Sequence, residues 1–467
     1  MTPNPAARPA GSTDAALSDL QQSLGAKVVV TEAVREQHGI DEGWHVGHAP
    51  DAVVFATSLD DVVTTVRVCH AHHTPLIPFG AGTSLEGQIA ALRGGVSLDL
   101  SGLDRIIEVN VGDLDCRVEA GVHRVALNDR LQRDGLFFPI DPGADATIGG
   151  MVATRASGTN AVRYGTMRDS VLGLTAVLAD GSIARTGTRA RKSSAGYDLT
   201  RLLVGSEGTL GVMTDVTLRL HGIPEVIGGA VCGFATLRGA VDTVIQVIQL
   251  GIPIARVEFL DAAQVAACNA YSDLDLPERP LLLMEFHGSP SAVDDQSAAV
   301  RELASANGGA DWQWSTDTET RNALWKARHD AYYAALALRP GCRGIPTDVC
   351  VPISRLADCI DQTRDDLETT GLTATIVGHV GDGNFHTLPL FDPDDQAERE
   401  AVEAFHDRLV HRALEMGGTC TGEHGIGYGK LAFMSQEHDV ASLAAMRAIK
   451  SALDPRGILN PGKVVPA

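Results

Sequence analysis

Segments dense in glycine, serine and threonine recur through the first half of the chain, each between stretches with the alternating pattern of β-strands. The clearest are the loop 78–87, which follows an apolar run, and the region 139–170. Linkers do not usually separate strongly patterned elements, and another strand is expected directly afterwards, at 172–178. Glycine lets a backbone approach a ligand closely because it has no side chain. We therefore expect this half of the chain to wrap a long ligand.

The loop Gly80-Ala81-Gly82-Thr83-Ser84 places several backbone N–H groups in one bend, which can hold a pyrophosphate without cationic side chains. The loop does not match the Rossmann fingerprint, because the spacing of a third glycine and the following helix are wrong. It is not a Walker loop, since no Lys-Ser or Lys-Thr pair follows. On this spacing alone a dinucleotide and a plain turn both remain possible. Three further segments, at 141–150, 156–160 and 205–211, favour the ligand.

Hydrophobic patterning predicts the secondary structure around these loops. The first half should contain helices at 58–70 and 125–133 and strands at 52–57, 75–78, 96–100, 106–109, 116–120 and 212–220. Gly222–Pro224 is expected to be a domain boundary. Beyond it the pattern is that of a split βαβ layer, with strands at 229–234, 256–260 and 281–286 and helices ending near 250 and 307. The expected parts are a tail with helices (1–45), a ligand domain (46–223), a cap domain (224–425) and a returning segment (426–467).

Composition excludes several classes of function. The formal net charge of −21 argues against nucleic acid or an anionic membrane face as a partner. No apolar run is long enough to span a membrane. The eight cysteines are scattered singly, which is typical of reduced thiols in a cytoplasmic protein. Residues 1–12 are expected to be a disordered tail without the apolar core of a signal peptide.

Two glycine-rich segments of the second half, 378–386 and 422–427, contain three histidines and the carboxylate of Glu423. Gly381-Asp382-Gly383-Asn384 has the composition of a tight turn, so the chain can reverse there and bring His379 and His386 together. Glu423 would then complete a two-histidine, one-carboxylate set, which suits a divalent metal with open positions for substrate. The alternative is that these histidines are unrelated surface or core residues.

His424 is the third of these histidines and a candidate acid–base group near neutral pH. In the alternative reading, Glu423-His424-Gly425 is an ordinary turn with Glu423 in a salt bridge and His424 exposed. A metal that polarises a small hydroxy acid and a histidine that takes its proton are the parts of an alcohol-oxidising site.

From about residue 40 to its C-terminus, the chain resembles the flavin-linked D-2-hydroxy-acid dehydrogenases. These are FAD enzymes of the vanillyl-alcohol-oxidase type, also called the PCMH type, and include D-lactate dehydrogenases and glycolate oxidase catalytic subunits. The segments that carry the resemblance, in the same order, are 78–88, 139–165, 205–212, 378–386, 422–427 and 460–462. The resemblance implies an α+β fold with a two-part FAD-binding domain, a ferredoxin-like cap domain, and a C-terminal segment that returns to the flavin.

The resemblance also implies which residues bind FAD. Gly80 to Ser84 would wrap the pyrophosphate, with Val212 near the adenine and Asn460 near the isoalloxazine. Thr83 stands near the position where some relatives attach FAD through a histidine, so we expect the FAD to be non-covalent. The full expected set is Pro78, Gly80, Ala81, Gly82, Thr83, Ser84, Gly87, Pro142, Gly143, Thr147, Gly149, Gly150, Ser157, Gly158, Tyr164, Gly165, Gly211, Val212 and Asn460.

In the substrate half, the resemblance assigns His379, His386 and Glu423 to a metal (zinc, manganese or iron) and His424 to the catalytic base. Arg328 falls near the arginine that binds the substrate carboxylate, with Arg321 as the competing candidate. An arginine on a helix is, however, more often solvated or in a surface salt bridge.

The substrate is expected to be a small D-2-hydroxy acid, with D-lactate favoured. A second carboxylate, as in 2-hydroxyglutarate, would need another cation, and the stretch 344–350 has none, Arg343 being the nearest. The alternatives are D-2-hydroxyglutarate or glycolate oxidation, a non-redox transferase such as alkyl-glycerone-phosphate synthase, and a non-catalytic flavin subunit. Electrons would pass to a separate, unidentified acceptor. A homodimer and a peripheral place at the inner membrane face are compatible with the sequence.

Overall fold

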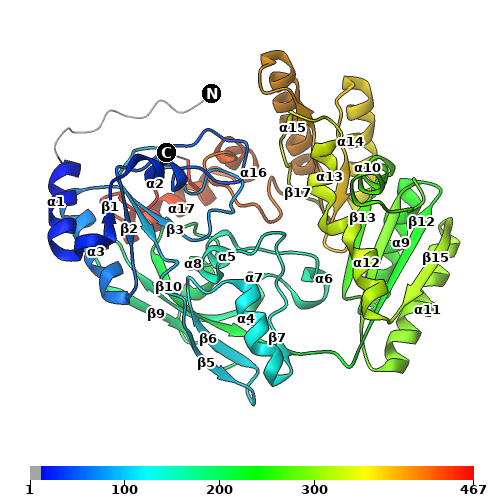
Figure 1. Ribbon diagram of the computed structural model, residues 1–467, viewed down its shortest axis with the longest axis horizontal. Helices are drawn as coiled ribbons and strands as arrows, with labels where there is room; N and C mark the ends of the chain where they lie inside the picture. The colour runs from blue at the N-terminus through cyan, green and yellow to red at the C-terminus, as the bar shows by residue number, and fades with distance from the viewer. Residues whose placement is uncertain (1–11, 467) are drawn as a thin grey trace. The chain divides into compact units, whose positions relative to one another are not determined.

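The computed structural model describes residues 12–466, which form two compact units (Figure 1). The first unit comprises the chain up to Ser157, residues 166–223 and residues 423 onward. The second unit comprises residues 158–165 and 224–422.

The first unit contains a four-stranded sheet that precedes the glycine loop. Its order is β1 (Val28–Val29), β2 (Ala52–Phe55), β4 (Val96–Asp99) and β3 (Leu76–Phe79), with the last three parallel. Helix α3 (Leu59–His72) begins at Ser58, whose side chain accepts a hydrogen bond from the Asp61 N–H. The helix buries Val62, Val66 and Cys69, which recur at the spacing of one helical face. Strand β3 therefore leads directly from a packed sheet into the glycine loop.

A second, antiparallel sheet of the first unit supports the other glycine-rich segments. Its order is β5 (Ile106–Asn110), β6 (Asp115–Glu119), β10 (Val212–Arg219), β8 (Val171–Val177) and β9 (Ile183–Gly187). Helices α4 (Arg124–Leu131) and α5 (Ile148–Thr154) share its apolar core, in which Val118, Ile148 and Val216 are fully buried. Region 139–170, predicted to be ligand-lining backbone, also contains α5, α6 (Ala161–Tyr164) and α7 (Met167–Ser170).

The C-terminal segment adds to the first sheet. After α17 (Val440–Leu453), Leu459 forms a parallel bridge with Leu76, and the Asn460 N–H donates to the Leu76 carbonyl at 2.8 Å. Lys450 donates to the carbonyls of Thr209 and Leu459, at 2.7 Å each. This places Asn460 beside the strand that enters the glycine loop.

The second unit is built on a seven-stranded antiparallel sheet. The order is β15 (Gly309–Ser315), β12 (Val226–Phe234), β14 (Leu281–Gly288), β13 (Arg256–Leu260), β18 (Ile376–Gly378), β19 (Asn384–Thr387) and β17 (Val349–Cys350). Helices α10 (Ala262–Ser272), α12 (Thr318–His329) and α13 (Ala331–Ala337) share an apolar cluster with β12, β13 and β14. Helices α9 (Leu237–Gln249), α11 (Pro290–Ala306), α14 (Leu356–Thr370) and α15 (Gln396–Glu415) also belong to this unit (Figure 1).

The compact units differ from the expected domains at three places. Helix α1 (Ser12–Leu24) packs against α3 and belongs to the first unit rather than to a separate N-terminal part. Residues 158–165, expected in the FAD-binding domain, belong to the second unit, and residues 423–425, expected in the cap, belong to the first. Most of the expected tail, 1–11, lies outside the described residues. Within the described range, no helix has the length and apolar character needed to cross a membrane.

Candidate active site

A tight hairpin brings two histidines of the second unit together. Strands β18 and β19 pair with Val377 opposite His386, and the Asp382 N–H donates to the His379 carbonyl at 3.0 Å inside the turn. Gly383 has φ +82°, a backbone conformation that favours glycine. The two imidazole centroids lie 5.3 Å apart, with the rings nearly perpendicular at 82°. The predicted reversal of the chain between these histidines is confirmed.

Each of the two imidazoles is oriented through its Nδ1 atom. Nδ1 of His379 lies 2.7 Å from Oε1 of Glu258, and Nδ1 of His386 lies 2.9 Å from the carbonyl oxygen of Thr347. Because both partners are hydrogen-bond acceptors, each neutral ring carries its proton on Nδ1 and its lone pair on Nε2. This is the tautomer of a histidine that binds a metal through Nε2.

Glu258 is a fully buried carboxylate with two partners. Its Oε1 faces His379, and its Oε2 accepts from Nε of Arg328 at 2.6 Å. Burial alone would raise the pKa of Glu258, but His379 and Arg328 outweigh burial and lower that pKa. Arg328 therefore uses its Nε in an ion pair rather than being solvated. Arg321, the competing candidate on the same helix as Arg328, lies against Gly229 of strand β12 and donates to Thr318 Oγ1 at 3.3 Å.

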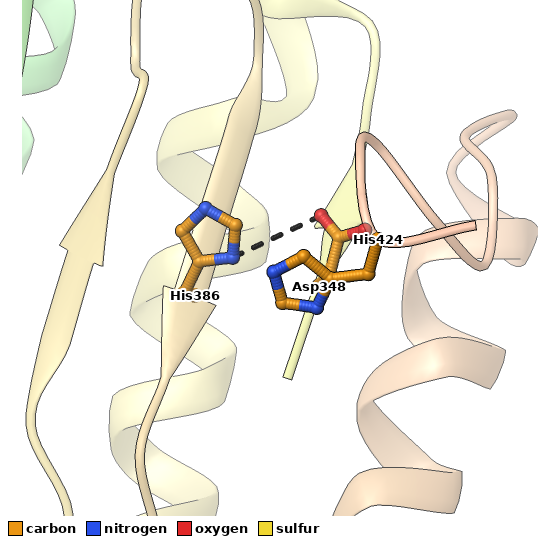
Figure 2. A group of neighbouring side chains, drawn as sticks. All are labelled: Asp348, His386 and His424. Atoms are coloured by element: carbon orange, nitrogen blue, oxygen red, sulfur yellow. Dashed lines mark ion pairs between the residues drawn. The ribbon is translucent and has the colours of Figure 1, made fainter. Parts of the chain in front are cut away.

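Asp348 is a second buried carboxylate of this region (Figure 2). Its Oδ1 lies 3.8 Å from Nδ1 of His386 and accepts from the Asn384 side chain at 2.7 Å. Its Oδ2 accepts from the Thr421 hydroxyl at 2.7 Å. Asp348 was not among the site residues predicted from the sequence. The signal that could have identified it is an aspartate within the apolar stretch 345–351.

Gly422 is the last residue of the second unit and lies beside Asn384 and Asp348. A side chain there would collide with the Asn384 amide and approach Asp348 Oδ1 to 3.0 Å, so only glycine fits. Since Glu423 is bonded to Gly422, its backbone starts from a residue packed beside Asp348 and Asn384.

In the first unit, Glu207 and Gln88 hold the backbone of the segment that carries His424. Gln88 donates to the His424 carbonyl at 2.7 Å. The carboxylate of Glu207 accepts from the N–H groups of Ile426 at 2.7 Å and Gly427 at 2.8 Å. A side chain at Gly425 would lie 2.5 Å from Oε1 of Glu207. The sequence analysis selected neither Gln88 nor Glu207.

A buried acidic group lies beside His424. Oε1 of Glu86 is 3.7 Å from Nδ1 of His424 and 3.4 Å from Nζ of the fully buried Lys430, and Oε2 is 3.1 Å from His45. Burial would raise the pKa of Glu86, but Lys430 and the two histidines together lower it. An ionised carboxylate at this position can stabilise the positive charge that the His424 imidazole gains when it accepts a proton.

Asn460 joins Gln88 and Glu207 to the C-terminal segment of the chain. Its side-chain amide donates to the carbonyls of Gln88 at 3.0 Å and Glu207 at 2.7 Å, and its Oδ1 accepts from Lys463 at 2.5 Å. Burial raises the pKa of Glu207 to about 7 and lowers the pKa of Lys463 to about 7. The amide of Asn460, expected near the isoalloxazine, thus makes hydrogen bonds within the protein.

The residues expected to bind FAD divide between the two units. Gly80 faces the Thr147 side chain and Gly150, so the loop 80–84 and the start of α5 lie side by side, and there is no room for a side chain at position 80. This arrangement gathers backbone N–H groups, as a pyrophosphate site requires. Gly82 and Gly87 have φ values of +73° and +75°, and Gly211 and Val212 lie at the start of β10. Gly158, Tyr164 and Gly165 belong to the second unit, where the Tyr164 hydroxyl is 2.7 Å from Nδ1 of His287.

Two family models and several curated proteins match this chain. The family model "FAD linked oxidases, C-terminal domain" matches residues 223–464, and the model "FAD binding domain" matches residues 50–187. The chain is 52% identical over 441 residues to a probable mitochondrial D-lactate dehydrogenase of Danio rerio, covering 94% of this chain and 89% of that protein. It is 45% identical to a mitochondrial D-lactate dehydrogenase (cytochrome) of Arabidopsis thaliana, covering 89% and 74%.

The fold is also found in a distant solved structure. The 4-ethylphenol oxidase of Gulosibacter chungangensis, in its isoeugenol complex, superposes with a TM-score of 0.77 at 19% identity, covering 98% of each chain. At this identity the likeness concerns the fold alone, and it confirms the expected α+β fold of the vanillyl-alcohol-oxidase type. FAD is the cofactor that both matched domains imply. The chain therefore belongs to the family of FAD linked oxidases.

Proposed function

We propose that this protein oxidises D-lactate to pyruvate and passes the electrons to a separate acceptor. The observation that carries the proposal is the pair of histidines on one hairpin, each with Nδ1 beside an acceptor and therefore with the tautomer of a metal ligand. The names of the two relatives at 52% and 45% identity support the choice of substrate.

His379, His386 and Glu423 are the proposed metal ligands. Two imidazoles and one carboxylate suit zinc, manganese or iron and leave positions for a substrate. A divalent metal bound there would polarise the substrate hydroxyl and lower its pKa. The position of Glu423 directly after Gly422, which packs beside Asp348 and Asn384, supports its inclusion.

His424 is the proposed base that takes the hydroxyl proton. Its carbonyl accepts from Gln88, and the two following N–H donors to Glu207 fix the backbone on its C-terminal side. Glu86, at 3.7 Å from Nδ1, favours the protonated imidazole that forms when the substrate loses its proton.

FAD held by the residues expected to bind it would supply flavin N5 as the acceptor of the hydride that leaves substrate C2. The loop 80–84 and Gly150 are proposed to hold the pyrophosphate through backbone N–H groups. We expect non-covalent attachment because Thr83 stands near the position of the covalent histidine in some relatives. A separate electron acceptor, a homodimer and a cytoplasmic location remain predictions, and both relatives named above are called mitochondrial.

Arg328 is the proposed group that neutralises the substrate carboxylate, with Arg321 as the alternative. Arg328 is 19% exposed, and its ion pair with Glu258 holds the guanidinium close to His379, whose Nδ1 donates to the same carboxylate. The lack of a second cation in the stretch 344–350 favours a monocarboxylate over D-2-hydroxyglutarate. Glycolate is the other small candidate.

Steady-state turnover with an artificial electron acceptor tests this proposal. We expect D-lactate to give pyruvate with a kcat/KM at least about tenfold above D-2-hydroxyglutarate and glycolate, and L-lactate to be inert. Equal efficiency on D-2-hydroxyglutarate would contradict the choice of substrate. Turnover of none of these acids by FAD-loaded protein would favour the transferase or non-catalytic alternatives.

A further inference from the structure

We propose that Glu258 is a positioning residue that holds His379 in the orientation and tautomer required for metal binding. The inference rests on the metal site of the proposed function and adds a residue that is not itself a ligand. It follows from three observations on the second unit: the burial of Glu258, its two partners, and its place on the sheet.

The burial of Glu258 requires an explanation. A carboxylate in the interior of a strand is strongly destabilising unless it is paired and hydrogen-bonded. Glu258 lies in β13, where its side chain is 0% exposed, and its neighbours in sequence are the buried Val257 and Phe259. A glutamate at this position is therefore retained for what it contacts rather than for its contribution to the core.

Both oxygens of the carboxylate are used. Oε1 is 2.7 Å from Nδ1 of His379, and Oε2 is 2.6 Å from Nε of Arg328. The three side chains form a chain of charge-assisted hydrogen bonds that runs from the guanidinium through the carboxylate to the imidazole. Arg328 fixes the carboxylate, and the carboxylate fixes the ring and keeps the proton on Nδ1.

The sheet register directs Glu258 toward the histidine pair. Leu260 is opposite Val377, and Val377 is opposite His386, so all three side chains project from one face of the sheet. Glu258, two residues before Leu260, projects from that same face. A partner of this kind behind a ligating histidine raises the basicity of the ring and reduces its freedom to rotate.

A glutamine cannot replace this carboxylate. Its amide has one acceptor oxygen and one donor nitrogen. In either orientation the NH₂ group would face an N–H donor, of His379 or of Arg328. Glu258→Gln therefore keeps the shape of the side chain while it removes one of the two hydrogen bonds and the charge.

The chain offers a matched control on the same face of the sheet. Glu285, opposite Arg256 in the neighbouring strand, is buried and holds His287 through a contact of the same length, 2.7 Å to Nε2. His287 also contacts the Tyr164 hydroxyl through Nδ1 and is not among the proposed ligands. Glu285→Gln removes a buried carboxylate beside a histidine without touching the proposed metal site.

The test compares metal binding by FAD-loaded wild type, Glu258→Gln and Glu285→Gln. Each protein is stripped with a chelator, and Zn²⁺ is then titrated against a fluorescent chelator of known affinity. We expect one equivalent of Zn²⁺ in the wild type, a dissociation constant 10- to 100-fold higher, to order of magnitude, in Glu258→Gln, and a change of less than about threefold in Glu285→Gln. Far-ultraviolet circular dichroism and FAD content check the folding of each variant.

If Glu258→Gln does not fold, Glu258→Asp is used, because it keeps the charge and withdraws the carboxylate from His379. Unchanged Zn²⁺ affinity in a folded Glu258 variant would overturn the inference and leave the proposed function intact. A wild type that binds no Zn²⁺ would overturn the metal site itself and, with it, the inference.

Discussion

The imidazole rings of His379 and His386 lie with their centroids 5.3 Å apart, although a seven-residue step along the chain separates them. This proximity depends on the turn at Gly383 and on the hydrogen-bond acceptor that each Nδ1 contacts. Substitutions can change each of these features independently.

Removal of one histidine should abolish metal binding and leave FAD in place. We expect His386→Ala to lose its metal and to lower kcat/KM by about 10³-fold, since polarisation by a metal contributes several kcal/mol. Metal content by atomic emission and the flavin absorption spectrum are the two measurements. The control is His72→Ala, which removes a partly exposed histidine paired with Asp19. Retention of metal and turnover by His386→Ala would contradict the proposed ligand set.

The turn between the histidines should not accept a side chain at position 383. Gly383 has φ +82°, and a β-carbon there would collide with the Val351 carbonyl. Gly371 has φ +67° and open space around it, so Gly371→Ala measures the cost of the backbone conformation alone, about 1 kcal/mol. We expect Gly383→Ala to lower the free energy of unfolding by a further 1–3 kcal/mol, roughly, and to weaken metal binding. Equal effects of the two substitutions in urea unfolding would show that the turn tolerates the change.

The role of His424 as the base can be tested independently of metal binding. His424→Ala should retain FAD and metal and lower kcat by about 10²- to 10⁴-fold, because proton transfer by a positioned side chain contributes that much. The measurement is the rate of flavin reduction in anaerobic stopped flow. A rate of flavin reduction near that of the wild type would exclude His424 as the base.

Glu207 should make the stability of the protein depend on pH. Burial raises the pKa of Glu207 from 4.5 to about 7. Between these two pH values the folded chain therefore binds a proton that the unfolded chain has lost. The stabilisation is therefore complete below pH 4.5 and is lost as the pH rises through 7. At about 1.4 kcal/mol per pH unit, the loss across the window is about 3 kcal/mol. Lys463, whose pKa is lowered to about 7, acts above pH 7 with the opposite sign.

Chemical unfolding at pH 5, 6 and 7 measures this effect. Glu207→Gln should remove the decline in stability over this range, whereas Glu36→Gln, on the exposed side of α2 (Glu32–Gln37), should retain it. Parallel pH profiles for the wild type and Glu207→Gln would show that Glu207 does not titrate in this window.

Local patterns predicted most of the local structure. The expected strand at 256–260 has the bounds of β13, and the turn residues 381–384 lie where the chain reverses. Both signals are short-range, because alternation and turn composition are properties of adjacent residues. The helix expected at 58–70 is likewise present as α3, with Ser58 as its N-cap.

The partners of the site residues could not be predicted in this way. Glu258 and His379 are 121 residues apart in sequence, and Glu207 and Ile426 are 219 apart. No local pattern specifies such pairs, since they depend on the register of the sheet and the path of the C-terminal segment. A charged residue inside an apolar strand, such as Glu258 between Val257 and Phe259, was the available signal. The Asn460 amide likewise donates to the carbonyls of residues distant in sequence, Gln88 and Glu207, and its expected place near the isoalloxazine remains a prediction.

The most direct test of the central claim is an anaerobic titration of the FAD-loaded protein with D-lactate, observed at the flavin absorption band. The titration is made on metal-replete protein and repeated after chelation. We expect D-lactate to bleach the flavin in the replete protein, L-lactate to leave it unchanged, and chelation to abolish the bleaching. Bleaching that survives complete removal of metal, or its absence in the replete protein, would contradict the proposal that a metal held by His379, His386 and Glu423 prepares a D-2-hydroxy acid for oxidation.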